Sequence, residues 1–209
     1  MNLNIKSDPD HAVAIYKNSY DTDLAYFPVS KYKPVLTPDV LAPDLLAQIY
    51  LQQSLLPTDA VEKHYKRMIT YAKTPFGFKV VSTPEGNYLP AAMYDIEGYT
   101  SQVNREKIPD GRYYCGGSYF LYDNIFLLNA YLHHIEGAAE LLKWRIALDF
   151  KIGSTTYETI NTKSGEPWKP NMGWNVAIYA FLRKLETENR VSKDFTNSLN
   201  QLILQGMAE

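Results

Sequence analysis

Apolar residues recur at every third or fourth position along much of the chain, which is the period of an amphipathic α-helix. Six segments show this period, at 43–56, 57–73, 117–137, 138–150, 174–190 and 192–205. Only a few residues separate the two segments of each successive pair, so each pair is expected to fold back on itself as a helical hairpin. The sequence therefore predicts three helical hairpins, at 43–73, 117–150 and 174–205.

Residues that commonly begin or end helices stand at the edges of these segments. Asp8 and Pro9 suit the first turn of a helix, so a further short helix is predicted over 8–20. Gly137 can end the helix that begins near the Gly-Gly pair, and Ser192 can cap the last helix. Local signals thus agree with the apolar period about where the helices lie.

A chain of 209 residues is long enough for one domain with its own core. We expect a single all-α helical domain over residues 1–209, in which two long segments, 76–116 and 151–173, connect the hairpins. Binding and catalytic residues are commonly carried on connecting segments of this kind. These two segments are therefore the predicted functional loops.

The charge balance narrows the choice of partners. The chain carries 21 Lys and Arg against 23 Asp and Glu, a net charge of −2, and no basic block. A nucleic-acid partner or an anionic membrane surface is therefore not expected. No apolar run approaches the roughly 20 residues that cross a bilayer. The first residues lack the pattern of a secretory signal, and the compartment is left open.

Cysteine and histidine offer little material for a metal site. Cys115 is the single cysteine, which excludes an internal disulfide and a metal site built from cysteines. His133 and His134 are adjacent in a predicted helix, so their side chains would point about 100° apart. We expect neither a metal ion nor another cofactor.

Glutamates and large aromatic residues stand close together in residues 156–179, with the sequence TYETINTKSGEPWKPNMGWNVAIY. This combination is typical of segments that grip and cleave sugars. Pro167 and Pro170 restrict the backbone around Trp168, while Gly165 and Gly173 permit sharp turns on either side. The segment is therefore predicted to be a rigid wall and not a mobile tether.

Two motifs between residues 110 and 185 resemble a known family. One is the turn Gly116-Gly117-Ser118-Tyr119 at the start of a helix, and the other runs from Glu158 to Gly173-Trp174 at the start of the next hairpin. Together they resemble the closing part of the six-hairpin (α/α)6 glycosidases, which include trehalases, processing α-glucosidases, α-rhamnosidases and glycoside phosphorylases. Cys115 departs from the pattern, because many relatives have Asn before the paired glycines.

The resemblance implies a fold of the (α/α)6-toroid type. Because the chain supplies about three hairpins of the six, we expect a partial toroid with long loops between the hairpins. The partial toroid would be a fragment of a longer protein, a half that a second chain or copy completes, or a degenerate relative with an open edge. The implied activity is inverting hydrolysis of a glycosidic bond in an oligosaccharide or other glycoside, with Glu158 as the general base.

Glycoside cleavage needs two carboxyl groups, and three residues are candidates. Glu158 is the first, against the alternative of a solvated loop residue. Glu166 is the second, against a role as an exposed turn residue. Asp123 is the third, although a carboxylate in the first turn of a helix more commonly binds the free amides there.

Seventeen tyrosines are the main oddity of the composition, and they either fill helix contacts or line a sugar site. The candidate substrate-binding residues are Tyr157, Trp168, Trp174, Tyr119, Tyr114 and Asn171. We expect Asn171 or Asn175 to orient Glu158 by a hydrogen bond. The alternative to an enzyme is a catalytically silent helical module that binds a sugar or a protein partner. An enzyme would gather Glu158, Trp174, Tyr119 and a second carboxylate on one concave face.

The paired glycines carry a further expectation. Gly116 and Gly117 should adopt conformations that a Cβ would resist, or allow another group to approach the main chain closely. Their replacement by alanine should therefore be harmful.

Overall fold

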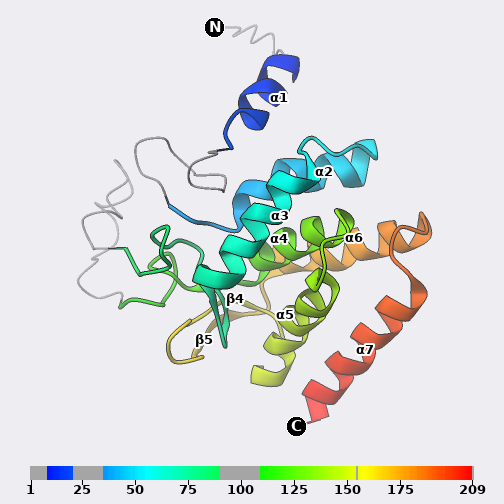
Figure 1. Cartoon of the computed structure of the whole chain (residues 1–209). Helices are drawn as coiled ribbons and strands as arrows, with labels where there is room; N and C mark the ends of the chain where they lie inside the picture. The colour runs from blue at the N-terminus through cyan, green and yellow to red at the C-terminus, as the bar shows by residue number, and fades with distance from the viewer. Residues whose placement is uncertain (1–8, 21–34, 90–108, 154, 209) are drawn as a thin grey trace, which may run out of the picture.

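The computed structural model describes residues 9–20, 35–89, 109–153 and 155–208. Its described part is mainly helical, as the apolar period predicts (Figure 1). The seven α-helices are α1 (Pro9–Lys17), α2 (Ala42–Leu51), α3 (Thr58–Arg67), α4 (Phe120–Leu132), α5 (Ala138–Gly153), α6 (Val176–Thr187) and α7 (Lys193–Ala208).

The expectation of a purely all-α fold is wrong, because two small antiparallel sheets accompany the helices. The first joins β1 (Lys73–Thr74) to β2 (Gly77–Phe78), directly after a π-helical turn at Met68–Ala72. The second has the order β3-β4-β5, formed by Ser118–Tyr119, Tyr157–Ile160 and Pro167–Pro170. β3 lies directly before α4, and β4 follows α5 after a short connection. The second sheet is therefore built from two parts of the predicted functional loop 151–173 and from the start of the predicted helix 117–137.

The central helix of the described structure is α4. It packs against α2, α5 and α6, and α5 packs in turn against α7. A helix that contacts neighbours on several sides needs apolar residues around most of its circumference. Phe126, Leu127 and Leu128 are consecutive and all fully buried, as this position requires.

One hydrophobic core extends from α2 to α7. Each of these helices contributes buried side chains to it, among them Leu45, Val61, Phe126, Leu142, Leu185 and Leu199. Five of these six residues are 0% exposed and Leu199 is 3% exposed, so they supply the apolar burial that stabilises the fold. No described helix has the length and apolar character needed to cross a membrane.

A buried ion network ties the helices to the sheets. Arg145 of α5 lies between two carboxylates, with Nε 2.7 Å from Asp123 Oδ2 and Nη1 2.5 Å from Asp149 Oδ1. Asp123 also accepts hydrogen bonds from the backbone N–H of Phe78 and the hydroxyl of Ser118, at 3.1 and 2.6 Å. Asp149 accepts a bond from the N–H of Tyr157 at 2.7 Å. The network therefore fixes β2, β3 and β4 against α4 and α5.

Candidate functional site

A cluster of aromatic rings lies on the three-stranded sheet. Tyr119 and Trp168 both stand opposite Thr159, on the strands that flank β4, so their side chains share one face of the sheet. The Tyr113 ring joins them, with its centroid 5.6 Å from that of Tyr119 and 4.9 Å from that of Trp168. Tyr122 lies 5.2 Å from Tyr119 by the same measure. We call the cluster of Tyr113, Tyr119, Tyr122 and Trp168, together with Arg112, Glu158, Glu166 and Lys169, the sheet site.

Two cations flank the Trp168 ring. The Nζ atom of Lys169 is 4.5 Å from the ring centroid, and the guanidinium carbon of Arg112 is 5.9 Å from it. Lys169 Nζ is also 5.5 Å from the centroid of Tyr113. At these distances the cations are attracted by the negative faces of the rings, so the aromatic surface has positive charge at its edges.

Glu158 is a buried carboxylate of this site. It stands opposite Lys169 in the antiparallel register of β4 and β5, and its Oε2 lies 3.0 Å from Lys169 Nζ. The Glu158 side chain is 3% exposed, whereas that of Lys169 is 45% exposed. The hydrogen bond with Glu158 raises the pKa of Lys169. Glu158 is thus not a solvated loop residue, and the lysine that covers it stays charged at neutral pH.

Glu166 lies at the outer edge of the same site. Its side chain is 60% exposed, and its Oε1 is 3.7 Å from a terminal nitrogen of Arg112. Arg112 lies close to both Glu166 and Trp168, and Lys169 lies close to both Glu158 and Trp168. Each glutamate is therefore paired with a cation that lies beside the same indole ring. Glu166 is therefore exposed, as in the alternative role of an exposed turn residue.

Asp123 does not belong to this site. It is fully buried, and burial raises its pKa although Arg145 opposes that shift. Its partners are Arg145, Ser118 and Phe78, not the free amides of its own helix as we expected. Asp123 is a structural residue of the buried network, and a role as a general acid has no support from its position.

Other predicted binding residues have structural contacts of their own. Asn175 donates from Nδ2 to the carbonyl of Tyr157 at 2.9 Å, and Asn171 bonds Thr155 through its side chain. The expectation that either asparagine orients Glu158 is therefore wrong. Trp174 is 53% exposed and stands in the 3-10 turn Gly173–Asn175 before α6.

The structure thus brings together Glu158, Glu166, Trp168 and Tyr119, and it places Tyr114 beside Tyr113, with ring centroids 5.3 Å apart. Arg112, Tyr113 and Lys169 also belong to the site, although they were not among the residues predicted from the sequence. A signal was present, because Arg-Tyr and Trp-Lys are adjacent pairs in the two loops. Only the register of β4 and β5, however, shows that Lys169 faces Glu158.

The paired glycines before β3 behave as predicted. Gly116 has φ +91°, and a Cβ there would lie 2.7 Å from the Tyr88 ring. A Cβ on Gly117 would lie 2.6 Å from the carbonyl oxygen of Tyr113, which accepts a hydrogen bond from the Gly117 N–H. The close approach of the Gly117 main chain to the Tyr113 main chain holds Tyr113 next to the sheet.

Gly117→Ala is expected to destabilise the protein by about 1–3 kcal/mol, because the backbone of residue 113 must move to admit the methyl group. Urea unfolding of both proteins measures this difference. Gly173→Ala is the matched control, since no atom lies within 4 Å of a Cβ built at Gly173. Equal stability changes for the two variants would contradict the steric account of this turn.

No family model, curated protein or solved structure matches the chain. A function must therefore be inferred from the residues of this chain and their geometry. In the described part of the chain, no group of three or more His, Cys, Asp or Glu side chains is placed to hold a metal ion. The sheet site offers aromatic faces, two cations and two carboxylates.

Proposed function

We propose that this chain is a carbohydrate-binding protein and that the sheet site holds the sugar. The observation that carries the proposal is the Trp168 ring with Lys169 and Arg112 beside it, each paired with a glutamate. A sugar ring has apolar C–H faces and a rim of hydroxyls. An aromatic face surrounded by a few fixed polar groups matches both properties.

The backbone of the site supports this proposal. Tyr113 and Lys169 have φ of 48° and 51°, in the left-handed region that side chains other than glycine rarely occupy. Such conformations are costly and concentrate at functional sites. Strand pairing between β4 and β5 holds Lys169 in place, and a site fixed before binding loses less entropy when a ligand arrives.

Trp168→Ala is expected to weaken oligosaccharide binding about tenfold, which corresponds to about 1.4 kcal/mol. Isothermal titration against a panel of neutral and charged oligosaccharides measures it. Trp174→Ala is the control, because Trp174 is 53% exposed and belongs to another turn. The proposal fails if no oligosaccharide binds, or if Trp174→Ala abolishes binding while Trp168→Ala does not.

Glycoside hydrolysis with Glu158 as the general base is the second candidate function. What favours it is the place of Glu158 in the sheet site, where its carboxylate is 3% exposed and lies 3.0 Å from Lys169 Nζ. The base would take a proton from water while a second carboxyl group protonates the leaving oxygen. Glu166 is the candidate for that second group, since it flanks the same indole ring. Movement of the exposed Lys169 side chain would uncover Glu158.

We further propose that the three helix pairs form part of an (α/α)6-type toroid. The first helices of the pairs support this, because α2 contacts α4 and α6, and α4 contacts α6. The second helices of the last two pairs, α5 and α7, also pack on each other. An inner layer of first helices and an outer layer of second helices would result.

A partial toroid leaves apolar faces without neighbours, and the edge helices have exposed apolar residues. Large apolar side chains that are at least 44% exposed on α2, α6 and α7 are Leu46, Tyr50, Leu51, Val176, Leu204 and Met207. Native mass in solution is therefore expected to exceed that of one chain and to fall on dilution. A monomer at every concentration would contradict the partial toroid.

A further inference from the structure

A second polar cluster lies where the turn between α2 and α3 meets the end of α4. Its centre is Asp44, whose side chain is fully buried. One carboxylate oxygen accepts hydrogen bonds from the N–H groups of Leu55 and Leu56, at 2.6 and 2.9 Å. The other accepts from the side-chain amides of Gln48 and Asn129, at 2.9 and 2.7 Å.

Asp44 is ionised in this environment. Burial by itself would raise its pKa, but the hydrogen bonds from His133, Asn129 and Leu56 outweigh burial and lower the pKa. An ionised carboxylate can only accept hydrogen bonds. Every group that touches Asp44 must therefore donate to it.

This requirement fixes the tautomer of His133. Its Nε2 lies 2.8 Å from Asp44 Oδ2, so Nε2 carries the hydrogen. The Nδ1 atom of a neutral imidazole is then an acceptor, and the hydroxyl of Thr58 lies 3.1 Å from it. Ser54 Oγ is 3.3 Å from Nε2, 3.2 Å from Asp44 Oδ1 and 2.7 Å from the carbonyl oxygen of Leu56, so its hydroxyl donates to these two oxygens and not to Nε2. Thr58 consequently donates its hydrogen to His133.

We propose that Thr58, His133 and Asp44 form an acyl-transfer site for carboxylic esters, separate from the sheet site. Thr58 is the nucleophile and His133 the general base, and Asp44 is a positioning residue that holds the imidazole. A hydroxyl bonded to a base that is oriented by a third group is the arrangement that activates such nucleophiles. His133 is 7% exposed, whereas Thr58 is exposed at the start of α3.

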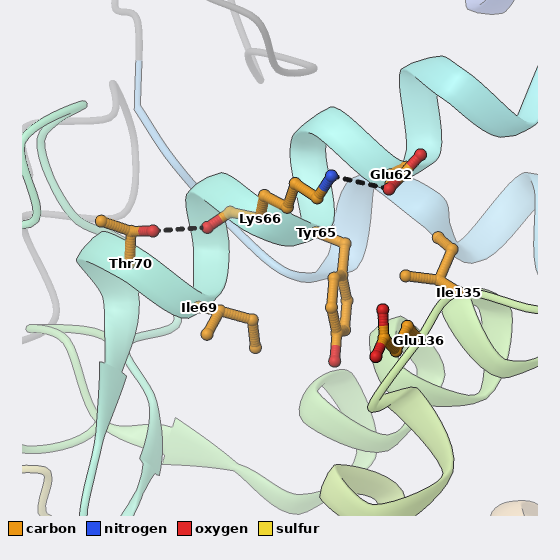
Figure 2. Close-up of a pocket in the computed structure, with 7 residues that line it drawn as sticks. All are labelled: Glu62, Tyr65, Lys66, Ile69, Thr70, Ile135 and Glu136. Carbon is orange, nitrogen blue, oxygen red and sulfur yellow. Dashed lines mark hydrogen bonds and ion pairs between the residues drawn. The ribbon is translucent and has the colours of Figure 1, made fainter.

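A hollow that begins one helical turn along α3 from Thr58 gives an ester a place to bind. Its volume is about 350 Å³, and it is lined by Glu62, Tyr65, Lys66, Ile69, Thr70, Ile135 and Glu136. Figure 2 shows Tyr65 between Ile69 and Ile135, so the middle of the hollow is apolar. The charged residues that line it are Glu62, Lys66 and Glu136. An apolar acyl chain fits this distribution better than a charged one.

The cluster and the hollow share two structural elements. Thr58 precedes Glu62 by four residues in α3, so the two side chains lie on the same helix face. His133 precedes Ile135 by two residues at the end of α4. An acyl chain that leaves the hollow past Glu62 and Ile135 would therefore extend toward the hydroxyl of Thr58, which does not itself line the hollow.

The start of α3 can stabilise the charge that forms on the carbonyl oxygen. The N–H groups of Ala60 and Val61 donate to the carbonyl of Pro57, so those of Thr58 and Asp59 precede the hydrogen bonds of the helix. Such first-turn N–H groups, at the positive end of the helix dipole, favour an anion. They can act as an oxyanion hole.

The reaction balances with water as the co-reactant. The hydroxyl oxygen of Thr58 forms a bond to the carbonyl carbon and its proton passes to His133 Nδ1. The ester C–O bond then breaks, and the leaving alkoxide takes that proton. Water attacks the acyl-threonine and gives its proton to His133, which returns it to the departing Thr58 oxygen. The products are the alcohol, the carboxylic acid and the restored site.

Hydrolysis of p-nitrophenyl esters with acetyl to octanoyl groups tests the site. We expect the wild-type protein to hydrolyse them and Thr58→Ala to reduce the rate at least about 100-fold, while Thr58→Ser retains activity. A fluorophosphonate probe should label residue 58 in the wild-type protein, as mass spectrometry of its peptides would show. Thr187→Ala is the control, since Thr187 is an exposed threonine at the end of α6.

Asp44→Asn separates positioning from a purely structural role. We expect Asp44→Asn to lower kcat for these esters and to leave KM nearly unchanged, because the imidazole of His133 loses the acceptor that fixes its tautomer and orientation. A purely structural aspartate would change the unfolding midpoint and leave the kcat of the folded fraction unchanged. The proposal is overturned if the wild-type protein neither hydrolyses these esters nor reacts with the probe, or if Thr58→Ala keeps the full rate. Trp168→Ala should not affect this activity.

Discussion

Replacing Arg145 with methionine is expected to destabilise the protein by about 3–5 kcal/mol, because two buried carboxylates would lose their cation. Arg145, Asp123 and Asp149 all have side chains that are 0% exposed. Methionine keeps much of the length and the packing of arginine but carries no charge. Urea unfolding at pH 7.5 measures the loss. For a 23.9 kDa protein of ordinary stability, the loss would be a large fraction of the total free energy of unfolding.

The loss should also depend on pH. Burial raises the pKa of Asp123 and of Asp149, and the charge of Arg145 opposes both shifts. Without the arginine, both pKa values should rise further. A carboxyl group whose pKa is raised by folding favours the folded state below its unfolded pKa of about 4. That contribution is lost as the pH rises through the folded pKa. The difference in free energy of unfolding between Arg145→Met and the wild-type protein should therefore decrease from pH 7.5 toward pH 5.

Arg183→Met is the matched control for this experiment. Arg183 forms an ion pair with Glu186 at 2.9 Å, but its side chain is 74% exposed. An exposed pair of this kind contributes at most about 1 kcal/mol. Similar losses from the two variants, or no loss from Arg145→Met, would contradict the role assigned to the buried network.

The helices were predictable because their signals are local. Segment 138–150 is the clearest case, since α5 occupies Ala138–Gly153 and starts at the expected residue. For the last hairpin, α6 and α7 begin within two residues of the predicted starts. A 3.6-residue apolar period needs no information from distant parts of the chain, which explains this agreement.

The sheets were not predictable in the same way. Ser118 and Tyr119 fall at the start of an expected helix, yet they pair with Ile160 and Thr159 as β3. A strand of two residues has no period of its own, and its stability comes from the partner strand. The same holds for Asp123, whose main partner Arg145 is 22 positions away in the chain.

The candidate site was predictable in its residue types and not in its geometry. Glu158, Glu166 and Trp168 stand in a short segment whose composition already indicates sugar binding. For Lys169 the adjacent Trp168 is only a weak signal, because a lysine beside a tryptophan is usually a surface residue. It becomes part of the site only because the register of β4 and β5 sets it opposite Glu158.

The ion pair between Lys169 and Glu158 makes the function of Glu158 testable by a single change. Glu158→Gln keeps the size of the side chain and removes its charge, so Lys169 loses its partner but is 45% exposed and stays solvated. The fold should therefore lose no more than about 1 kcal/mol. Binding of the oligosaccharide should change little, because Trp168 and Tyr113 still supply the aromatic face.

If Glu158 is the general base, Glu158→Gln should reduce hydrolysis at least about 100-fold, since a neutral amide cannot take a proton from water. The substrate is the oligosaccharide that binds best in the titrations. Release of reducing ends measures cleavage, and the anomer that forms first shows whether the configuration is inverted. Glu140→Gln is the control, because Glu140 has a side chain that is 76% exposed and pairs only with Lys143 among the ion pairs of the described residues. Full activity in Glu158→Gln would place the base elsewhere, with Glu166 as the next candidate. A wild-type protein that binds the sugar through Trp168 but cleaves none would instead identify the sheet site as a binding site, with Glu158 serving to hold Lys169 beside the indole ring.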